Sequence, residues 1–412
     1  MKGKYDFFDY DKCSFCGICL ERCNYLHFTH EESVEEIKKL IAGEKTRILD
    51  GCIYCSACNA FCPDDCHPYE LILNRVYESG RKNGIPLKAK WVMPLPYPPQ
   101  NFRSALVSSM PQDEKALINR WEAQSYDLAH EEMMYAGCNL LALPYLANSK
   151  VFEDLPIFGR WDLCCGEMFY RGGVFDIVQQ QADRLTEYFA SSEIKRLVFM
   201  CPAGYRMFKE VLPGQFGAKF SFEPVFVAHW ILDRMNSGKV KVERELDMTV
   251  TVQDSCHARI MNPSEEMEPW REILGRIGVK IVEMEHSGVD GYCCGMAAGA
   301  KQYFGLKDVV TNASKALKEA KATGASELVT YCAGCYLTAG MGGLVSYRGQ
   351  PTRHVMEYLK YAIGEPLDTR IKLRTLHTVA GLLLHVLIPA IFRGSRTYMP
   401  TLNAIWTKER RI

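Results

Sequence analysis

Short apolar segments run directly into cysteines at several places in the chain. Residues 248–252 read Met-Thr-Val-Thr-Val and precede Cys256, and residues 197–200 read Leu-Val-Phe-Met and precede Cys201. A helical pattern of apolar and polar positions follows each cysteine. Because β-branched apolar runs of this length are typical of buried strands, the pattern predicts strand–loop–helix units of an open α/β sheet, with functional groups at the carboxyl ends of the strands.

The same order of segments occurs twice, which indicates an internal repeat. Residues 133–143, 162–169 and 196–207 correspond to residues 251–261, 291–298 and 327–338. We therefore expect an α/β domain made of two related, Rossmann-like units, the first over residues 131–243 and the second over residues 244–350.

Before these units the pattern is helical. Residues 30–43 have the period of an amphipathic helix that ends at Gly43, and we assign residues 1–90 to a first, α-helical domain. Residues 94–111 hold five prolines and little periodicity. We expect them to run extended over the surface, as part of a linker over residues 91–130.

The last segment, residues 351–412, contains an apolar run at 376–392. Its 17 residues fall short of the roughly 20 that a membrane-spanning helix needs. Basic residues flank it on both sides, as in a helix that lies at an anionic membrane surface, and the same apolar face would serve a helix that docks on a partner protein. His377 and His385 are eight residues apart and cannot both ligate one haem iron.

Cysteine content changes this picture more than charge does. The 412 residues suffice for two or three domains, and 49 basic against 49 acidic residues give no field that favours nucleic acid. The 18 cysteines would suggest disulfides in a secreted protein, but the chain starts without an apolar signal segment, so we expect a cytoplasmic protein with reduced thiols. No glycine-rich phosphate-binding motif follows a strand, so we expect flavin, NAD or ATP only on a partner.

Eight cysteines form two runs in the first domain. The first run reads C-x2-C-x2-C-x3-C, and the second repeats it with a following proline. Three closely spaced thiolates can bind three irons of a cubane, and in two-cluster ferredoxins the fourth ligand comes from the other run. The spacing predicts two [4Fe–4S] clusters, one held by Cys13, Cys16, Cys19 and Cys62 and the other by Cys52, Cys55, Cys58 and Cys23. Zinc is the alternative, although structural zinc sites use paired C-x2-C knuckles.

The second unit holds five further cysteines in one spaced set. Cys256 is followed after 36 residues by Cys293 and Cys294, and after another 37 residues by Cys332 and Cys335. Because three separate turns at the carboxyl edge of one sheet can deliver these thiolates to one point, the set predicts a cluster pocket. Five thiolates exceed the four ligands of an ordinary cubane, which makes the site unusual.

The first unit is less complete. Its cysteines are Cys138, Cys164, Cys165 and Cys201, and Gly204 stands where the repeat has Cys335. Four thiolates are enough to hold a regular cubane. The other interpretation is a degenerate unit that packs against its twin and closes the pocket.

These motifs resemble known families. The first domain, with 28 residues between Cys23 and Cys52, is similar to the α-helical ferredoxin domain of iron–sulfur subunits of succinate dehydrogenase and heterodisulfide reductase. The spaced set in the second unit, a cysteine, then Cys-Cys-Gly, then C-x2-C, resembles the cysteine-rich (CCG) domain of heterodisulfide reductase, anaerobic glycerol-3-phosphate dehydrogenase, glycolate oxidase and lactate utilisation proteins. The whole arrangement resembles the D-type subunit of heterodisulfide reductase, up to about residue 350.

This resemblance implies a cofactor and a chemistry. It implies a noncubane [4Fe–4S] assembly held by Cys256, Cys293, Cys294, Cys332 and Cys335. In heterodisulfide reductase two such clusters divide the sulfurs of the substrate disulfide between them. The incomplete first unit favours electron relay, or reduction at a single site, over that parent reaction.

Polar residues lie next to the ligands. His257 follows Cys256 directly, Asp254 precedes it by two residues, Glu167 follows the first Cys-Cys-Gly, and Tyr205 follows the last cysteine of the first unit. A histidine here can donate a proton to a departing thiolate, or tune the cluster by a hydrogen bond. The alternative is a loop histidine bonded to the backbone.

Three other residues are expected to be structural. Cys66 has no place in either ferredoxin set, and we interpret it as a small, partly buried thiol rather than an alternative ligand. His229 and His286 have no comparable chemical context, so we assign them no role in the site.

The sequence therefore predicts an iron–sulfur subunit of an anaerobic redox complex. It would relay electrons between the ferredoxin clusters and the cluster of the second unit, with a flavoprotein or a membrane cytochrome or quinone-reactive subunit as partner. Contact with the inner face of the membrane would run through residues 376–392. The alternative is an oxidoreductase that itself reduces a disulfide or heterodisulfide at the Cys256 cluster. A zinc-stabilised scaffold is a third interpretation, which the two ferredoxin runs oppose.

Overall fold

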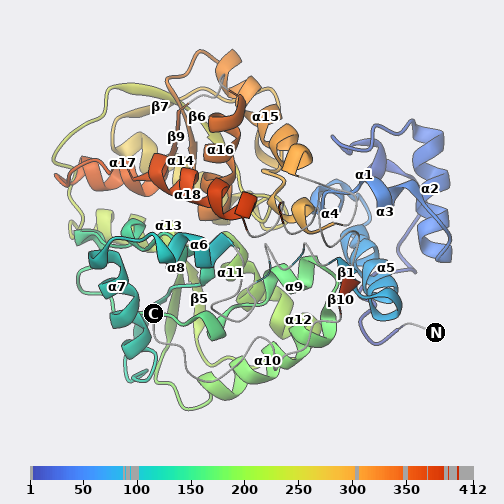
Figure 1. Ribbon diagram of the computed structural model, residues 1–412, viewed down its shortest axis with the longest axis horizontal. Coiled ribbons are helices and arrows are strands. Elements are labelled where there is room, and N and C mark those ends of the chain that lie inside the picture. Colours follow the sequence, from blue (N-terminus) through green and yellow to red (C-terminus); the bar gives the residue numbers. More distant parts are fainter. Residues whose placement is uncertain are drawn as a thin grey trace.

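The chain folds into a helical amino-terminal domain and two α/β units. Figure 1 shows the amino-terminal helices at one side of the two units, which lie one above the other. The computed structural model describes residues 3–86, 89, 93, 102–301, 306–346, 351–368, 370–384, 388 and 397–398.

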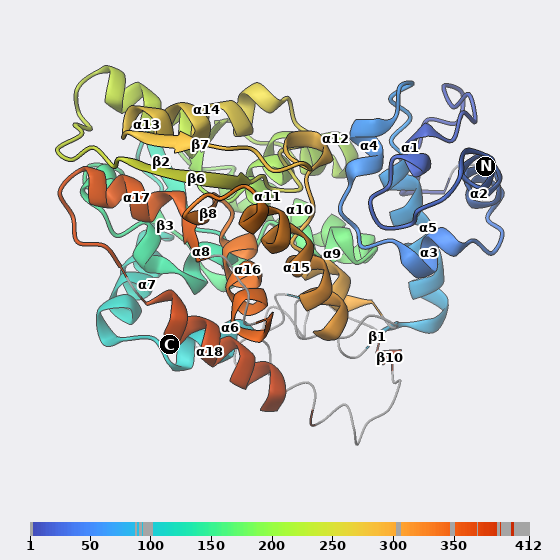
Figure 2. The same cartoon turned by 90° about the horizontal axis from the view of Figure 1, so that it is seen from above.

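The predicted helix over residues 30–43 is confirmed as α2. Its first turn is closed by a capping box between Thr29 and Glu32, and Gly43 ends it in the left-handed conformation with φ 74°. Ile37 and Leu40 are buried on the side that packs against α5. The helices of this domain are α1 (Ile18–Glu21), α2 (His30–Ala42), α3 (Arg47–Gly51), α4 (Ala57–Phe61) and α5 (Pro68–Asn83). Figures 1 and 2 both place α4 at the side that faces the two units.

The predicted repeat is confirmed by two sheets of the same topology. Each has four parallel strands, in the order β3-β2-β4-β5 in the first unit and β7-β6-β8-β9 in the second. The central strands β4 and β6 are apolar and buried over most of their length, as expected for a parallel sheet covered by helices on both faces. The strands are β2 (Glu132–Tyr135), β3 (Ile157–Phe158), β4 (Arg196–Phe199), β5 (Glu223–Phe226), β6 (Met248–Gln253), β7 (Val279–Ile281), β8 (Glu327–Thr330) and β9 (Thr352–His354).

Helices follow most of these strands, and the units differ in how the helices are divided. The first unit contains α8 (Cys138–Ala142), α9 (Glu167–Arg171), α10 (Phe175–Phe189), α11 (Pro202–Arg206), α12 (Leu212–Phe216) and α13 (Val227–Asn236). The second contains α14 (Pro263–Arg276), α15 (Leu306–Ala322), α16 (Ala333–Ser346) and α17 (Val355–Ala362).

The second unit extends beyond the expected boundary at residue 350. Strand β9 pairs with β8 and completes the sheet, and α17 follows it directly. The buried Glu357 of α17 accepts a hydrogen bond of 2.8 Å from Tyr336 of α16, which fixes α17 to the unit. The edge strand escaped prediction because it is only three residues long.

The expected extended linker is also different. Residues 94–101 lie outside the described residues, but the chain is helical in α6 (Phe102–Ser108) and α7 (Gln112–Gln124). Helix α6 packs against α18 (Ile371–Leu382), and α7 packs against β3. Four of the five prolines precede α6, and the fifth, Pro111, stands at the N-cap of α7. Apolar residues such as Leu106 and Trp121 are buried, which holds these helices against the first unit.

The tail begins with a helix that is part of the folded body. Helix α18 packs against α6 and α16, and its residue Arg374 forms a buried ion pair with Glu114 of α7. Its outer face leaves Leu373 and Leu376 more than half exposed. Within the described part of the chain, no helix combines the length and the apolar character needed to cross a membrane. Most of the predicted run after residue 384, including His385, lies outside the described residues.

A short ladder joins the end of the amino-terminal domain to the last described residues of the chain. Strand β1 (Ile85–Pro86), which follows α5, pairs antiparallel with β10 (Thr397–Tyr398).

Candidate functional site

None of the 18 cysteines, all of which are described, forms a disulfide. They gather in four groups, two in the amino-terminal domain and one in each α/β unit.

The first predicted set lies together near the surface of the amino-terminal domain. Burial raises the pKa of Cys19, and the neighbouring thiols of Cys62, Cys16 and Cys13 raise it further. Cys66 lies in the same place, because its backbone N–H donates to Cys62 Sγ at 3.4 Å. The structure thus brings the predicted four sulfurs together and adds Cys66, which is buried, beside them.

The second predicted set lines a cavity at the inner side of this domain. Cys23, Cys52, Cys55 and Cys58 all contribute to its wall, together with Arg259 of the second unit. Burial raises the pKa of Cys23 to about 11 and that of Cys52 to about 12. A thiol in this position loses its proton to a base or to water when a strong Lewis acid binds the sulfur, and iron is such a Lewis acid.

The loops that carry these cysteines have a backbone suited to anionic sulfur. Tyr54 and Ser56, on either side of Cys55, have positive φ angles of 61° and 62°, and Phe15 has one of 59° in the first run. Left-handed residues between right-handed ones turn successive N–H groups toward one point, a geometry found in iron–sulfur sites. The N–H of Tyr54 already donates to Cys52 Sγ at 3.3 Å.

The five cysteines of the second unit form one buried cluster. Hydrogen bonds between neighbouring thiols link them in the order Cys256, Cys293, Cys294, Cys335 and Cys332. Each is at most 7% exposed. The hydrogen bond from Cys293 lowers the pKa of Cys294, and the one from Cys335 lowers that of Cys332. The same pairings, together with burial, raise the pKa of Cys256, Cys293 and Cys335, so the arrangement favours negative charge on two of the five sulfurs.

A single zinc ion does not suit these groups. Four thiolates bound to zinc at about 2.3 Å lie about 3.8 Å from one another. Among the described residues, three possible metal ligands lie within 4.8 Å of one another in the group of Glu285, His286 and Glu319. This group contains no cysteine. The cysteine sulfurs are spread more widely than one ion requires, as the ligands of a multi-iron cluster are.

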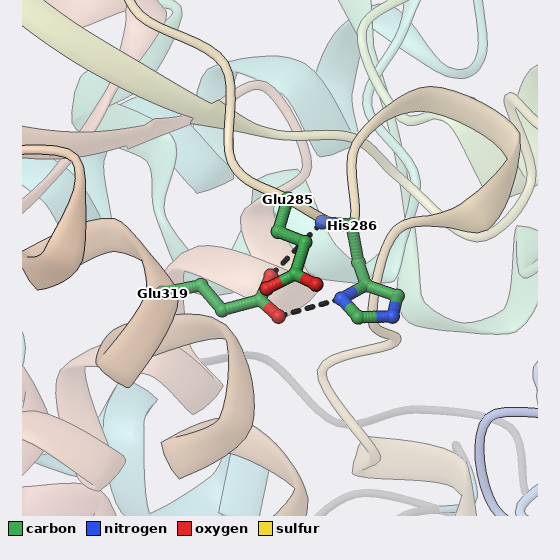
Figure 3. Close-up of side chains that lie close together, drawn as sticks. All are labelled: Glu285, His286 and Glu319. Atoms are coloured by element: carbon green, nitrogen blue, oxygen red, sulfur yellow. Dashed lines mark hydrogen bonds and ion pairs between the residues drawn. The ribbon is translucent and has the colours of Figure 1, made fainter.

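Figure 3 shows that trio, with Glu285 and His286 from the loop after β7 and Glu319 from α15. His286 Nδ1 is 2.6 Å from Glu319 Oε1, and the backbone N–H of His286 donates to the other oxygen of Glu319 at 3.1 Å. The imidazole packs on the ring of Tyr292 at 4.7 Å. These contacts fasten the loop after β7 to α15.

The four cysteines of the first unit also converge. Cys138 Sγ lies 3.9 Å from Cys164 Sγ. The thiols of Cys138 and Cys201 lie near enough to Cys165 to raise its pKa. At Gly204, where the repeat has Cys335, an added Cβ would lie 3.5 Å from Phe199 and 3.8 Å from Cys201. These are ordinary contact distances, so the fifth ligand is absent without a steric reason.

The two cysteine groups of the α/β units face each other. Burial raises the pKa of Cys201 and the thiol of Cys332 raises it further, and both residues lie at the carboxyl ends of central strands. Asn139 lies between them, with its amide nitrogen 3.9 Å from Cys201 Sγ. A hydrogen bond of 3.2 Å between Tyr145 and Tyr336 also joins the units.

A buried polar network surrounds Cys256. Arg171 of α9 directs Nη1 and Nη2 at Cys256 Sγ, both at 3.4 Å, and Nη2 lies 2.6 Å from His257 Nε2. Glu167 Oε1 lies 3.1 Å from His257 Nε2. Burial alone would raise the pKa of Glu167, but the positive charge of Arg171 helps to hold that pKa far below its usual range. Within the described residues, His257 Nδ1 is buried and has no hydrogen-bond partner. The structure thus brings two predicted residues, Glu167 and His257, to the site.

Two other predicted polar residues have structural partners. Asp254 accepts hydrogen bonds from Arg271 at 2.8 and 2.9 Å and from Tyr331 at 2.9 Å. Tyr205 donates to Glu265 at 2.8 Å. These bonds hold the loops in place. Because both side chains are used in them, neither is placed to act on the cysteine sulfurs.

The amino-terminal domain docks directly on the second unit. Ser56 Oγ lies 3.2 Å from the carbonyl oxygen of Cys256, and the N–H of Cys293 donates to Tyr25 at 2.8 Å. Lys301 donates to the carbonyl of Cys52 at 2.6 Å and to two carbonyls just before it.

Sequence reasoning missed the residues of this interface, Arg171 above all. A weak signal was present, because Arg171 and Lys301 each lie six or seven residues after a Cys-Cys pair. Both side chains donate to carbonyls of the same segment of the amino-terminal domain, Arg171 to Tyr54 and Lys301 as described above.

Comparisons with known proteins agree with this picture. Residues 133–209 and 250–339 match the model of the cysteine-rich domain family, CCG. The D-type subunit of dihydromethanophenazine:CoB–CoM heterodisulfide reductase from Methanosarcina mazei is 28% identical over 70% of this chain and 71% of that protein. The probable iron–sulfur-binding oxidoreductase FadF of Bacillus subtilis is 32% identical over 35% of this chain and 20% of that protein. The EtfAB:quinone oxidoreductase of Syntrophomonas wolfei is 26% identical over 41% of this chain and 24% of that protein.

Proposed function

We propose that this chain, a CCG cysteine-rich domain protein related to the D-type subunit of heterodisulfide reductase, is the iron–sulfur electron-transfer subunit of an anaerobic redox complex. Two [4Fe–4S] clusters occupy the amino-terminal domain, and a further cluster is held by the five cysteines of the second unit. Electrons pass between them. A flavoprotein or a membrane cytochrome or quinone-reactive subunit exchanges electrons with one end of this chain.

One observation carries the proposal. Cys55, a ligand in the second ferredoxin set, belongs to the same buried cluster of contacting side chains as Cys256 and Cys293. Ser56 and Tyr25 tie this part of the amino-terminal domain to the backbone of the same two cysteines. Electron transfer between centres becomes rapid when they are close and joined by packed atoms without intervening water, and this interface supplies that condition.

The chain's own residues hold and shield the clusters. When bound, the clusters supply one-electron redox chemistry. The thiolates of the three groups ligate them, and burial of all five cysteines in the second unit keeps water away. Charged neighbours, including Arg171 and Arg259, offset the negative charge that sulfur brings into this interior.

The group of four cysteines in the first unit can have one of two roles. They suffice for a regular cubane, which would give the chain a fourth cluster. Without a cluster, the unit closes the pocket of its twin, against which Cys201 and Asn139 lie.

Iron counting on protein purified without oxygen tests the proposal. Two, three or four clusters correspond to about 8, 12 or 16 irons with equal sulfide. Replacing Cys335→Ala should remove about four irons and one EPR signal and leave the signals of the amino-terminal clusters. Cys66→Ala is the matched control, since it removes a buried cysteine outside the proposed sets and should leave the iron content unchanged.

Two outcomes would overturn parts of this function. Zinc in place of iron and acid-labile sulfide would end the redox role altogether. Turnover of a disulfide by the isolated chain with reduced viologen would show that the chain is a reductase in its own right, with the Cys256 cluster as its active site, rather than a relay.

A further inference from the structure

We propose that Arg171, a residue of the incomplete first unit, sets the reduction potential of the cluster held by the second unit. The inference rests on the proposed cluster at Cys256 and goes beyond it, since it assigns the tuning of that cluster to a side chain from the other unit.

Both terminal nitrogens of the Arg171 guanidinium contact one ligand sulfur. Nη1 and Nη2 each lie 3.4 Å from Cys256 Sγ, so that the fork encloses the sulfur. A guanidinium is permanently charged and its donors are fixed in one plane, a geometry that a lysine ammonium cannot copy. Arg171 is therefore a fixed positive charge with two hydrogen bonds on a single thiolate.

The remaining donors of Arg171 hold it in that orientation. Nε donates to Glu167, Nη1 donates to the carbonyl of Tyr54 at 2.9 Å, and Nη2 contacts His257. Arg171 is 5% exposed and Glu167 is 8% exposed. Because all sides of the group are occupied and solvent is nearly absent, its position relative to Cys256 is determined by three parts of the fold.

This position has a definite effect on electron affinity. Reduction adds negative charge to a cluster and its thiolates, and hydrogen bonds to sulfur and nearby positive charge stabilise that state. The effect is strong here because the interior has a low dielectric constant. Arg171 therefore raises the potential of the second-unit cluster, while the carboxylate of Glu167 offsets part of that rise.

The same side chain explains why an incomplete unit is useful. Its contact with the Tyr54 carbonyl places the guanidinium between the loop of Cys52 and Cys55 and the ligand Cys256. The first unit thus contributes a positioning residue to the electron path even if its own cysteines bind nothing.

An EPR-monitored redox titration of the full chain, purified without oxygen, tests the proposal. In Arg171→Gln, the oxidised-to-reduced ratio of the second-unit cluster at the wild-type midpoint should rise at least tenfold, which for one electron is a shift of 59 mV to lower potential. Arg171→Lys, which keeps the charge but loses the fork, should shift in the same direction by less. Glu167→Gln should shift the potential upward.

Arg206→Lys is the matched control. Arg206 is also a buried arginine of the first unit, and it binds Glu70 of the amino-terminal domain at 3.2 Å. Its ion-pair partners are the carboxylates of Glu70 and Glu210 rather than a ligand sulfur. Its replacement should perturb the domain contact and leave the potential of the second-unit cluster unchanged.

The outcomes separate this inference from the function on which it rests. A wild-type chain without a second-unit cluster would overturn the proposed function. A cluster that is present, but whose potential does not move in Arg171→Gln, would overturn the role of Arg171 alone. If Arg171→Gln loses the cluster, Arg171→Lys decides, because an unchanged potential in that variant with the cluster in place would overturn the role of the guanidinium.

Discussion

The backbone N–H of Cys293 donates a hydrogen bond of 2.8 Å to the phenol oxygen of Tyr25, a residue 268 positions earlier in the chain. Tyr25 comes just after Cys23 in the amino-terminal domain, and Cys293 belongs to the cysteine group of the second unit. The bond therefore joins two proposed cluster sites through the backbone of a ligand, and it makes the docking of the domain testable.

Tyr25→Phe leaves the N–H of Cys293 without its acceptor in a buried place. We expect a loss of about 1–3 kcal/mol of stability, seen as a lower midpoint of thermal unfolding, because an unsatisfied buried donor bears its full desolvation cost. Tyr126→Phe is the control, since Tyr126 is 74% exposed. Equal midpoints for Tyr25→Phe and the wild type would show that the bond does not hold the domains together.

Gly204→Cys restores the ligand that the first unit lacks. The space around Gly204 accepts a Cβ at ordinary contact distances, so we expect the variant to fold. The added thiol should change the EPR spectrum of the first-unit group, or add iron if that group is empty in the wild type. Gly214→Cys, at a site with no atom within 4 Å of the added Cβ, introduces a thiol elsewhere and should do neither.

Glu357 makes stability depend on pH. Burial raises the pKa of Glu357 to about 7 from an ordinary value of 4.5. Between these values the folded chain keeps a proton that the unfolded chain has lost, so the stability from this group is complete below about pH 4.5 and is lost as the pH rises through 7. The total effect is at most about 3 kcal/mol.

Glu357→Gln removes this dependence and can still accept the hydrogen bond from Tyr336. From pH 6 to pH 8 the wild type should lose about 1 kcal/mol more stability than the variant, measured by unfolding under nitrogen. The exposed Glu131→Gln should behave as the wild type does. An identical pH profile for Glu357→Gln and the wild type would contradict the raised pKa.

The outer face of α18 is the expected contact with a partner subunit. Leu373 is 54% exposed and Leu376 is 56% exposed, so Leu376→Asp should leave the unfolding midpoint almost unchanged. It should weaken co-purification with the partner redox subunit in the native organism. Val282→Asp, at an exposed apolar residue on the second unit, is the control. Undiminished co-purification of Leu376→Asp would place the partner elsewhere.

The sequence by itself determined the local elements and the inventory of cysteines from which the ligand sets are proposed. The amphipathic period and the cap at Gly43 specify α2, and the repeated order of apolar run, cysteine and helix specifies two parallel sheets. Such features follow from residues close together in the chain, where spacing alone constrains geometry. The ligand sets at Cys13 and Cys52 could be written down for the same reason, and their sulfurs lie in two groups as expected.

Only the tertiary structure decided how these parts meet. Cys55 lies beside Cys293, Arg171 reaches across two units to Cys256, and β9 joins the second sheet from beyond its expected end. These contacts join residues tens to hundreds of positions apart. They depend on how whole faces pack rather than on a local pattern, and so a buried arginine on a thiolate had no signature in the sequence until the fold placed it there.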